Sequence, residues 1–146
     1  MSERKIMLMG AMLAITLMSI GVSGLLTTSK TLDTSGSIMA INIGVYSNSA
    51  CTIPISSLDW GTPEPGDIVT RTVYLKNTGN ADMILNMYVS NWSPTGVDNY
   101  LSLNWNRENF EISPNEVVQA TITLSVGSGI TGITDFSFRV TLQGTG

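Results

Sequence analysis

Histidine is absent from this chain, and cysteine occurs once, at Cys51. The lack of histidine removes the commonest general base and metal ligand, together with every Ser-His and Cys-His catalytic arrangement. A single cysteine forms no disulfide within the chain, so we interpret Cys51 as a small buried apolar residue, with pairing between molecules or a nucleophilic role as the alternatives. We therefore expect a protein that is not an enzyme, that holds no metal or other cofactor, and that depends on its hydrophobic core for stability.

Charge is also scarce. Charged residues make up 12% of the 146 residues, and the formal net charge is −4. This is about half of the usual charged share, and the few lysines and arginines are scattered, so no basic stripe is present to neutralise a phosphate backbone. Nucleic acid is therefore not an expected partner. The length fits a single domain of roughly 120 residues after an export-like N-terminus.

The N-terminus has the layout of a secretory signal. A basic pair, Arg4 and Lys5, precedes a stretch without charge over residues 6–29, of which residues 6–22 are dense in Met, Leu, Ile and Ala. A positive start followed by an apolar helix is typical of export signals. The apolar stretch is longer than a usual signal core and just short of a membrane span, so residues 1–24 are predicted to be a signal peptide or a membrane anchor. Either way, the remaining chain is expected at the cell surface or outside the cell.

The rest of the chain favours β-structure. Residues 25–37 are rich in serine and threonine and predict a linker. Beyond it, apolar and polar residues alternate with a period of two, which is typical of half-buried strands. The alternation is cleanest from Val118 to Val126. The expected strands cover residues 39–45, 51–58, 68–76, 85–90, 101–105, 118–126 and 136–143.

Turn residues separate these strands, and no amphipathic helix is evident. Proline and glycine mark a turn over residues 61–67, and similar signals occur at 77–80 and 113–116. About seven short strands joined by such turns predict an all-β fold, an antiparallel two-sheet sandwich of immunoglobulin-like topology without a disulfide. We assign this domain to residues 38–146. Arg71 falls on the apolar face of its strand, so a bulge or an escape of its side chain to solvent is expected there.

Two segments carry a family resemblance. Residues 65–69 (PGDIV) and 73–80 (VYLKNTGN) resemble the small immunoglobulin-like domains common on archaeal and bacterial surface proteins. In those domains a V-x-V-x-N-T-G-N strand pairs across the sandwich with a later strand that follows a Ser-Pro-Gly turn. Here Ser113-Pro114 matches that turn, and Asn115 stands where glycine is usual. The resemblance implies a structural surface domain.

The overall plan is similar to the small exported fibre subunits of the TasA and archaeal bundling-pilus type, in which a signal, a Ser/Thr-rich segment and one β-sandwich follow each other. That resemblance implies a filament subunit, of a pilus or fibre, whose free N-terminal segment completes the sheet of the next subunit by donor-strand exchange. The linker has few apolar residues, so the donor strand would have to reach into the first strand of the domain. The candidate donor residues are Ile38, Met39, Ile41, Ile43 and Val45. The implied partners are further copies of the chain or other surface proteins, and the membrane if the N-terminal helix is retained.

Aromatic residues beside turns suggest an alternative function. Trp60 and Trp92 could stack on sugar rings, whereas Trp105 lies on the apolar parity of its strand and is expected in the core. The alternative is therefore a non-catalytic surface binding module for glycan or protein partners.

Two further motifs concern modification and ions. Asn91-Trp92-Ser93 is a sequon, so Asn91 is a glycosylation candidate in an exported protein. Asp59, Glu64 and Asp67 flank one loop, where carboxylates can bind calcium, but no D-x-D-x-D-G run is present and we interpret them as solvated turn residues.

Overall fold

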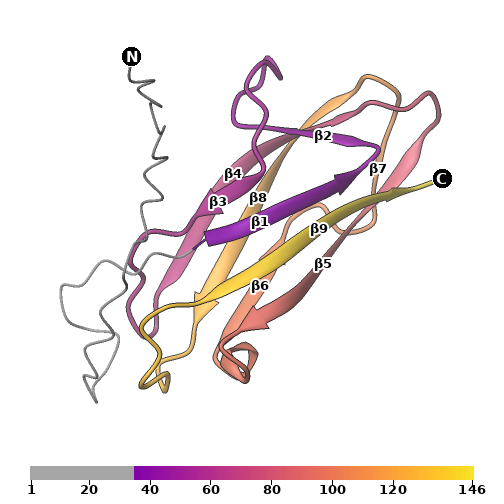
Figure 1. The fold of residues 1–146 in the computed structure, drawn as a ribbon. Helices are drawn as coiled ribbons and strands as arrows, with labels where there is room; N and C mark the ends of the chain where they lie inside the picture. The colour runs from indigo at the N-terminus through magenta and orange to yellow at the C-terminus, as the bar shows by residue number, and fades with distance from the viewer. Residues whose placement is uncertain (1–34) are drawn as a thin grey trace, which may run out of the picture.

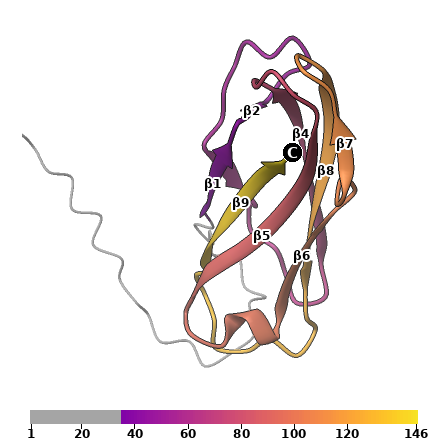
Figure 2. The same cartoon turned by 90° about the vertical axis from the view of Figure 1, so that its right-hand side faces the viewer.

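The computed structural model describes residues 35–146, which form two stacked β-sheets (Figures 1 and 2). The expected signal or anchor at 1–24 and most of the expected linker lie outside these residues. Within them, the predicted all-β architecture is confirmed. The elements are β1 (Ser35–Ile41), β2 (Ile43–Tyr46), β3 (Ser57–Asp59), β4 (Ile68–Asn77), β5 (Met83–Ser93), the 3₁₀ turn η1 (Val97–Asn99), β6 (Leu101–Trp105), β7 (Phe110–Ile112), β8 (Val117–Val126) and β9 (Ser137–Thr145).

One sheet has the strand order β3-β1-β9-β5-β7, and the other has the order β2-β4-β8-β6. Long antiparallel pairs form the centre of each sheet: β4 with β8, and β5 with β9. The β5–β9 register shifts between Ser90 and Ser93, where Asn91 takes a positive φ of 55°. This irregularity is typical of a β-bulge, which bends the end of β5.

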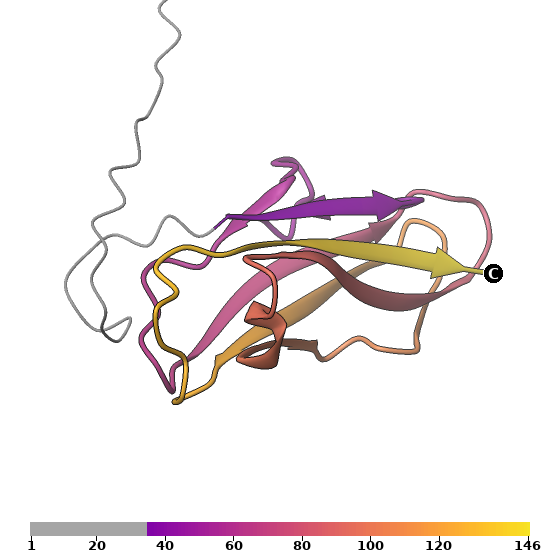
Figure 3. The same ribbon diagram turned by 60° about the horizontal axis from the view of Figure 1, so that its bottom comes forward.

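The pairing of β1 departs from the expected antiparallel arrangement. β1 runs parallel to β9 over its whole length, from Ser35 opposite Ser137 to Ile41 opposite Gln143. Figures 1 and 3 show the two arrows side by side and pointing the same way. Parallel neighbours need a long connection, and here every other strand of the domain lies between them in the chain. Alternation within a single strand carries no information about this pairing, so the sequence pattern did not predict it.

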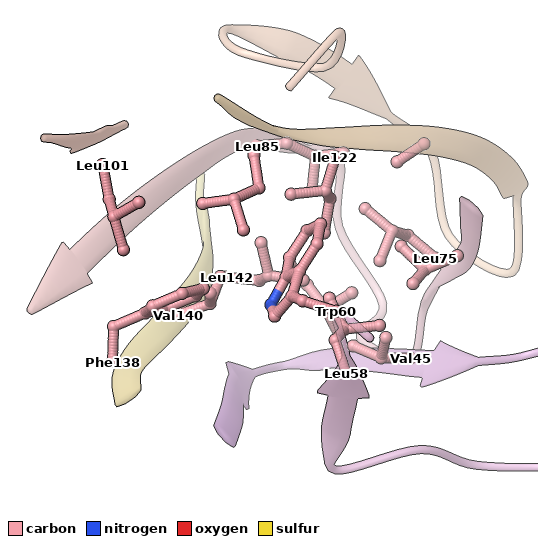
Figure 4. Packing of buried hydrophobic residues seen from close by; sticks show 14 of the residues in the cluster. Val45, Leu58, Trp60, Leu75, Leu85, Leu101, Ile122, Phe138, Val140 and Leu142 are labelled. Carbon is pink, nitrogen blue, oxygen red and sulfur yellow. The ribbon is translucent and has the colours of Figure 1, made fainter. Parts of the chain in front are cut away.

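The hydrophobic core lies between the sheets and follows the predicted alternation (Figure 4). Every second residue of β8 is buried, from Val118 to Val126, and the same holds for Phe138, Val140 and Leu142 on β9. Because strand side chains point to alternate faces, each sheet turns one apolar face inward. The remaining strands contribute Val45, Leu58, Val73, Leu75, Leu85, Leu101 and Ile112, among others.

The first predicted strand is wrong in its continuity. Residues 39–45 were expected to form one strand, but the chain breaks at Asn42, whose φ is 58°. β1 joins one sheet and β2 joins the other, so the inward parity changes between them: Ile38 packs against the core from β1, whereas Ile43 and Val45 do so from β2. A left-handed residue turns the chain sharply, and asparagine tolerates that conformation better than most residues.

The strand count also exceeds the expected number. β3 and β7 are each three residues long, too short to show an alternation in the sequence. β1 begins at Ser35, three residues before the expected domain boundary at 38.

Candidate functional site

The position of β1 beside β9 is the candidate functional site, because it is formed by the N-terminal segment that the resemblance singled out. On one side β1 pairs with β9, and on the other its first residues pair with β3, with Ser35 opposite Asp59 and Ser37 opposite Ser57. The N–H of Ile38 donates to the carbonyl of Ser56 at 2.7 Å. β1 is thus an inner strand that completes its sheet.

Gly36 brings β1 into close contact with two aromatic side chains. It is buried, and a methyl group added to it would lie 3.2 Å from Nε1 of Trp60 and 3.3 Å from Cε2 of Phe138. The Trp60 and Phe138 rings lie with their centroids 6.1 Å apart. Such contacts are tighter than most side-chain contacts, so any larger residue at position 36 would have to displace these rings by a few tenths of an ångström.

Trp60 lies among the labelled core side chains in Figure 4 and is 1% exposed. Its indole N–H has no hydrogen-bond partner among the described residues. The guanidinium of Arg71 lies over the ring, 5.7 Å from its centroid, and donates from Nε to the carbonyl of Asp59 and from Nη1 to that of Thr70. This is how Arg71 is accommodated on the apolar parity of β4: its guanidinium lies over the tryptophan ring and bonds to two backbone carbonyls.

Asn42 joins β1 to the rest of the domain. Its carbonyl accepts hydrogen bonds from the backbone N–H of Thr78 at 3.4 Å and from Thr78 Oγ1 at 3.0 Å. Immediately after it, Ile43 and Val45 are each 6% exposed, and β2 pairs with β4. The chain is therefore fixed at and after residue 42 by contacts that do not involve β1.

Asn42 divides the candidate donor residues between two strands. Ile38 is half-buried on β1, while Ile43 and Val45 are core residues of β2. The side chains of Met39 and Ile41 lie outside the described part of the structure. The expectation of one continuous apolar donor strand from 38 to 45 is corrected, since only the part before Asn42 occupies the place beside β9.

The structure also corrects the expectation for Trp60 as a ligand-stacking residue. A side chain that is 1% exposed presents no ring face to a sugar. Trp92 is half-buried, with its ring 4.8 Å from that of Phe138. Trp105, expected in the core, is half-buried, and its Nε1 donates to Oε2 of Glu108 at 2.5 Å. Position beside a turn therefore did not distinguish the buried from the accessible tryptophan.

The carboxylates of the 59–67 loop act within the loop. Oδ1 of Asp59 accepts from the N–H of Gly61, and Oδ2 of Asp67 accepts from that of Glu64, both at 2.8 Å. Side-chain oxygens in these positions stabilise turns. Within residues 35–146, no group of three or more Cys, Asp or Glu side chains is arranged to hold a metal ion.

Asn91 and Cys51 lie at the surface. Asn91 is exposed at the bulge of β5, where the sequon ends at Ser93. Cys51 was expected to be buried, but it is half-buried in the loop after β2, with a positive φ of 53°. It is not one of the residues that form the core or pack against it.

Asn77 is a structural residue whose role the sequence analysis missed. It is 0% exposed at the end of β4, where a polar side chain was not expected. Its Nδ2 donates to the carbonyls of Ala81 and Ile112, and its Oδ1 accepts from the N–H of Gly79. The Asn-Thr-Gly-Asn run could have indicated this role, because a buried asparagine can satisfy the backbone groups that a turn leaves without partners.

Among residues 35–146, no helix is long and apolar enough to cross a membrane. Neither a scan against protein-family models nor a search of curated proteins finds a match to this chain.

Proposed function

We propose that this protein is a structural protein of the cell surface, a pilus or fibre subunit that assembles by exchanging β1 with a second copy of the chain. The observation that carries the proposal is the parallel pairing of β1 with β9. It makes an N-terminal segment an inner strand of a sheet whose other members come from the rest of the domain. In the proposal residues 1–24 direct export, the partner is the protein itself, and no catalysis or cofactor is involved.

An immunoglobulin-like strand order supports this reading. The sheet β2-β4-β8-β6 has the order of strands A, B, E and D, and β5 and β9 correspond to C and F. In an immunoglobulin domain strand G lies beside F. Here β1 takes that place. A strand supplied from a distant part of the chain is the kind of element that donor-strand complementation exchanges between subunits.

β1 is also separable from the domain. Thr78 holds the carbonyl of Asn42, and β2 pairs with β4, so the core beyond residue 42 can remain in place when β1 leaves. In a neighbouring copy β1 would take the same register on β9. Because the exchanged and closed forms then share their contacts, their free energies differ little, and protein concentration favours assembly.

A disulfide across β1 and β3 tests the proposal. Ser37 and Ser57 are register partners in antiparallel strands, where opposite Cα atoms lie about 4.5–5.5 Å apart, within the range that a disulfide requires. With Cys51→Ser in the background, the oxidised full-length Ser37→Cys/Ser57→Cys protein should form no filaments in electron microscopy. Reduction should restore filaments.

The matched control places the same pair of substitutions elsewhere. Ser102→Cys/Ser125→Cys joins register partners of β6 and β8 and leaves β1 free, so this protein should form filaments whether oxidised or reduced. Filaments of the β1-locked protein under oxidising conditions would overturn the proposal. So would a wild-type protein that remains monomeric both after purification and on cells.

The alternative is a surface module that binds glycan or protein partners. Its candidate contact residue is Trp92, because Trp60 is buried. Glycan arrays with the wild type and Trp92→Ala test it, and a wild type that binds no glycan removes the glycan part. The proposed modification of Asn91 is tested by mass spectrometry of the protein from its own cells. An unmodified peptide containing residue 91 would reject it.

A further inference from the structure

The two sheets have four edge strands, and three of them are blocked among the described residues. β3 and β7 are three residues long. Next to β7, the carboxylate of Glu108 accepts the N–H of Met87 on β5 at 3.2 Å. The loop after β2 covers that strand, because the backbone carbonyl of Val45 accepts from the N–H of Ile55 at 3.0 Å. Short strands, charges and covering loops are the usual means of preventing contacts between sheet edges.

The carboxylate of Glu108 also accepts from Nε1 of Trp105, but β6 itself has none of these features. Its five residues, Leu-Ser-Leu-Asn-Trp, include no charge and no proline. It pairs with β8 on one side, and no strand within residues 35–146 pairs with the other side. The carbonyl of Tyr100 accepts from the N–H of Gly127 at 2.7 Å, and the N–H of Asn106 donates to the carbonyl of Thr121 at 3.3 Å.

The direction of the free backbone groups follows from these bonds. In an antiparallel pair alternate residues bond to the same neighbour, so positions 100, 102, 104 and 106 face β8. The N–H and C=O groups of Leu101, Leu103 and Trp105 therefore point away from the sheet. Their side chains face inward: Leu101 is buried, whereas Leu103 and Trp105 pack on the core and remain half-buried. Ser102 and Asn104 are exposed on the outer face.

We propose that β6 pairs antiparallel with β6 of a second copy about a twofold axis. The segment is self-complementary: with Leu103 opposite the partner's Leu103, Leu101 lies opposite the partner's Trp105 and Ser102 opposite the partner's Asn104. The free backbone groups then bond to each other, apolar side chains meet on the inner face, and polar ones meet on the outer face. The half-buried Leu103 and Trp105 gain cover, and because β6 carries no charge, two copies of it meet without like charges facing each other.

The β6 contact does not rest on the proposed strand exchange. β2, which follows β1 in the chain, lies at the opposite edge of this sheet from β6. Exchange of β1 would join copies through one sheet, and β6 pairing would join copies through the edge of the other. In a filament the second contact would hold neighbouring filaments side by side.

A charge exchange on the outer face tests the pairing. Ser102→Lys/Asn104→Lys places lysines opposite lysines in the twofold register, whereas Ser102→Glu/Asn104→Glu does the same with carboxylates. In sedimentation experiments the protein with unchanged β6 should associate reversibly, and each variant alone should associate about tenfold more weakly. The equimolar mixture of the two variants should recover association as a heterodimer. The control Thr70→Lys/Thr72→Lys adds the same charges to exposed positions of the inner strand β4 and should associate like the wild type.

These measurements are made on the full chain with β1 locked to β3 by the Ser37–Ser57 disulfide, which removes strand exchange from the result. Circular dichroism of each variant checks the fold. A locked protein that stays monomeric at every concentration overturns the β6 proposal and leaves strand exchange untouched. Unchanged association of the lysine variant, or no recovery in the mixture, also overturns it.

Discussion

Replacing Asn77 by alanine should destabilise the domain more than any surface change of similar size. The side chain is 0% exposed, with Nδ2 2.8 Å from the carbonyl oxygen of Ala81 and 3.0 Å from that of Ile112. Its Oδ1 lies 2.8 Å from the N–H nitrogen of Gly79. One residue therefore joins the end of β4, the following turn and β7.

The magnitude follows from how well each lost partner can reach water. Ala81 is exposed and Gly79 is half-buried, so these groups can bond to solvent after the change, and each loss costs about 0.5–1 kcal/mol. Ile112 is 0% exposed, and its carbonyl would stay buried without this bond, at a cost of about 1–3 kcal/mol. The free energy of unfolding should fall by about 3 kcal/mol in total, a large part of the roughly 5–15 kcal/mol typical of a domain.

Urea unfolding of the full chain, followed by tryptophan fluorescence, measures this loss. Asn80→Ala is the control, because Asn80 is exposed in the same turn and its replacement should change stability by less than about 0.5 kcal/mol. Asn77→Asp should be at least as damaging as Asn77→Ala, since a carboxylate offers no N–H to the carbonyl of Ile112. A loss below about 1 kcal/mol for Asn77→Ala, with an unchanged urea dependence, would refute the reasoning.

Two further substitutions test the packing. Gly144→Ala places a methyl group against the side chain of Met83 and should lower the free energy of unfolding by about 1–3 kcal/mol in the same urea titration. Gly129→Ala, whose methyl group meets no atom within 4 Å, should have little effect. Equal values for the two variants would contradict the packing of β9 on β5. Arg71→Met keeps an apolar side chain but loses the guanidinium over Trp60 and its backbone bonds, so the midpoint of thermal unfolding should fall by an amount equivalent to about 1–2 kcal/mol. An unchanged midpoint would show that the guanidinium contributes nothing.

Strands that alternate and stay within one sheet, such as β4, β6 and β8, were predictable from the sequence. The expected strand at 68–76 is β4 (Ile68–Asn77), and that at 101–105 has the same bounds as β6. In both, an inward apolar face and an outward polar face are imposed by the sandwich on each strand separately. Local alternation therefore carries enough information to predict them.

The features that depend on another part of the chain were not predictable in this way. Met39, Ile41, Ile43 and Val45 share one parity, which predicted a single strand, but the change of sheet at Asn42 reverses the inward face. Parity within a segment cannot reveal which sheet each half joins.

Burial of single aromatic residues was equally hidden. Trp60 lies beside a turn in the sequence, and it is buried because Gly36 and Phe138, distant in the chain, pack on it. The candidate site was predicted only as a segment, residues 38–45. Its place beside β9 emerged from the topology.

The most direct test of strand exchange asks whether β1 of one copy lies against β3 of another. Two full-length proteins, one with Ser37→Cys and one with Ser57→Cys, both in the Cys51→Ser background, are mixed, assembled and oxidised. We predict disulfide-linked pairs containing one chain of each kind on a non-reducing gel, because these positions are register partners. Filaments that form without that intermolecular disulfide would contradict the account.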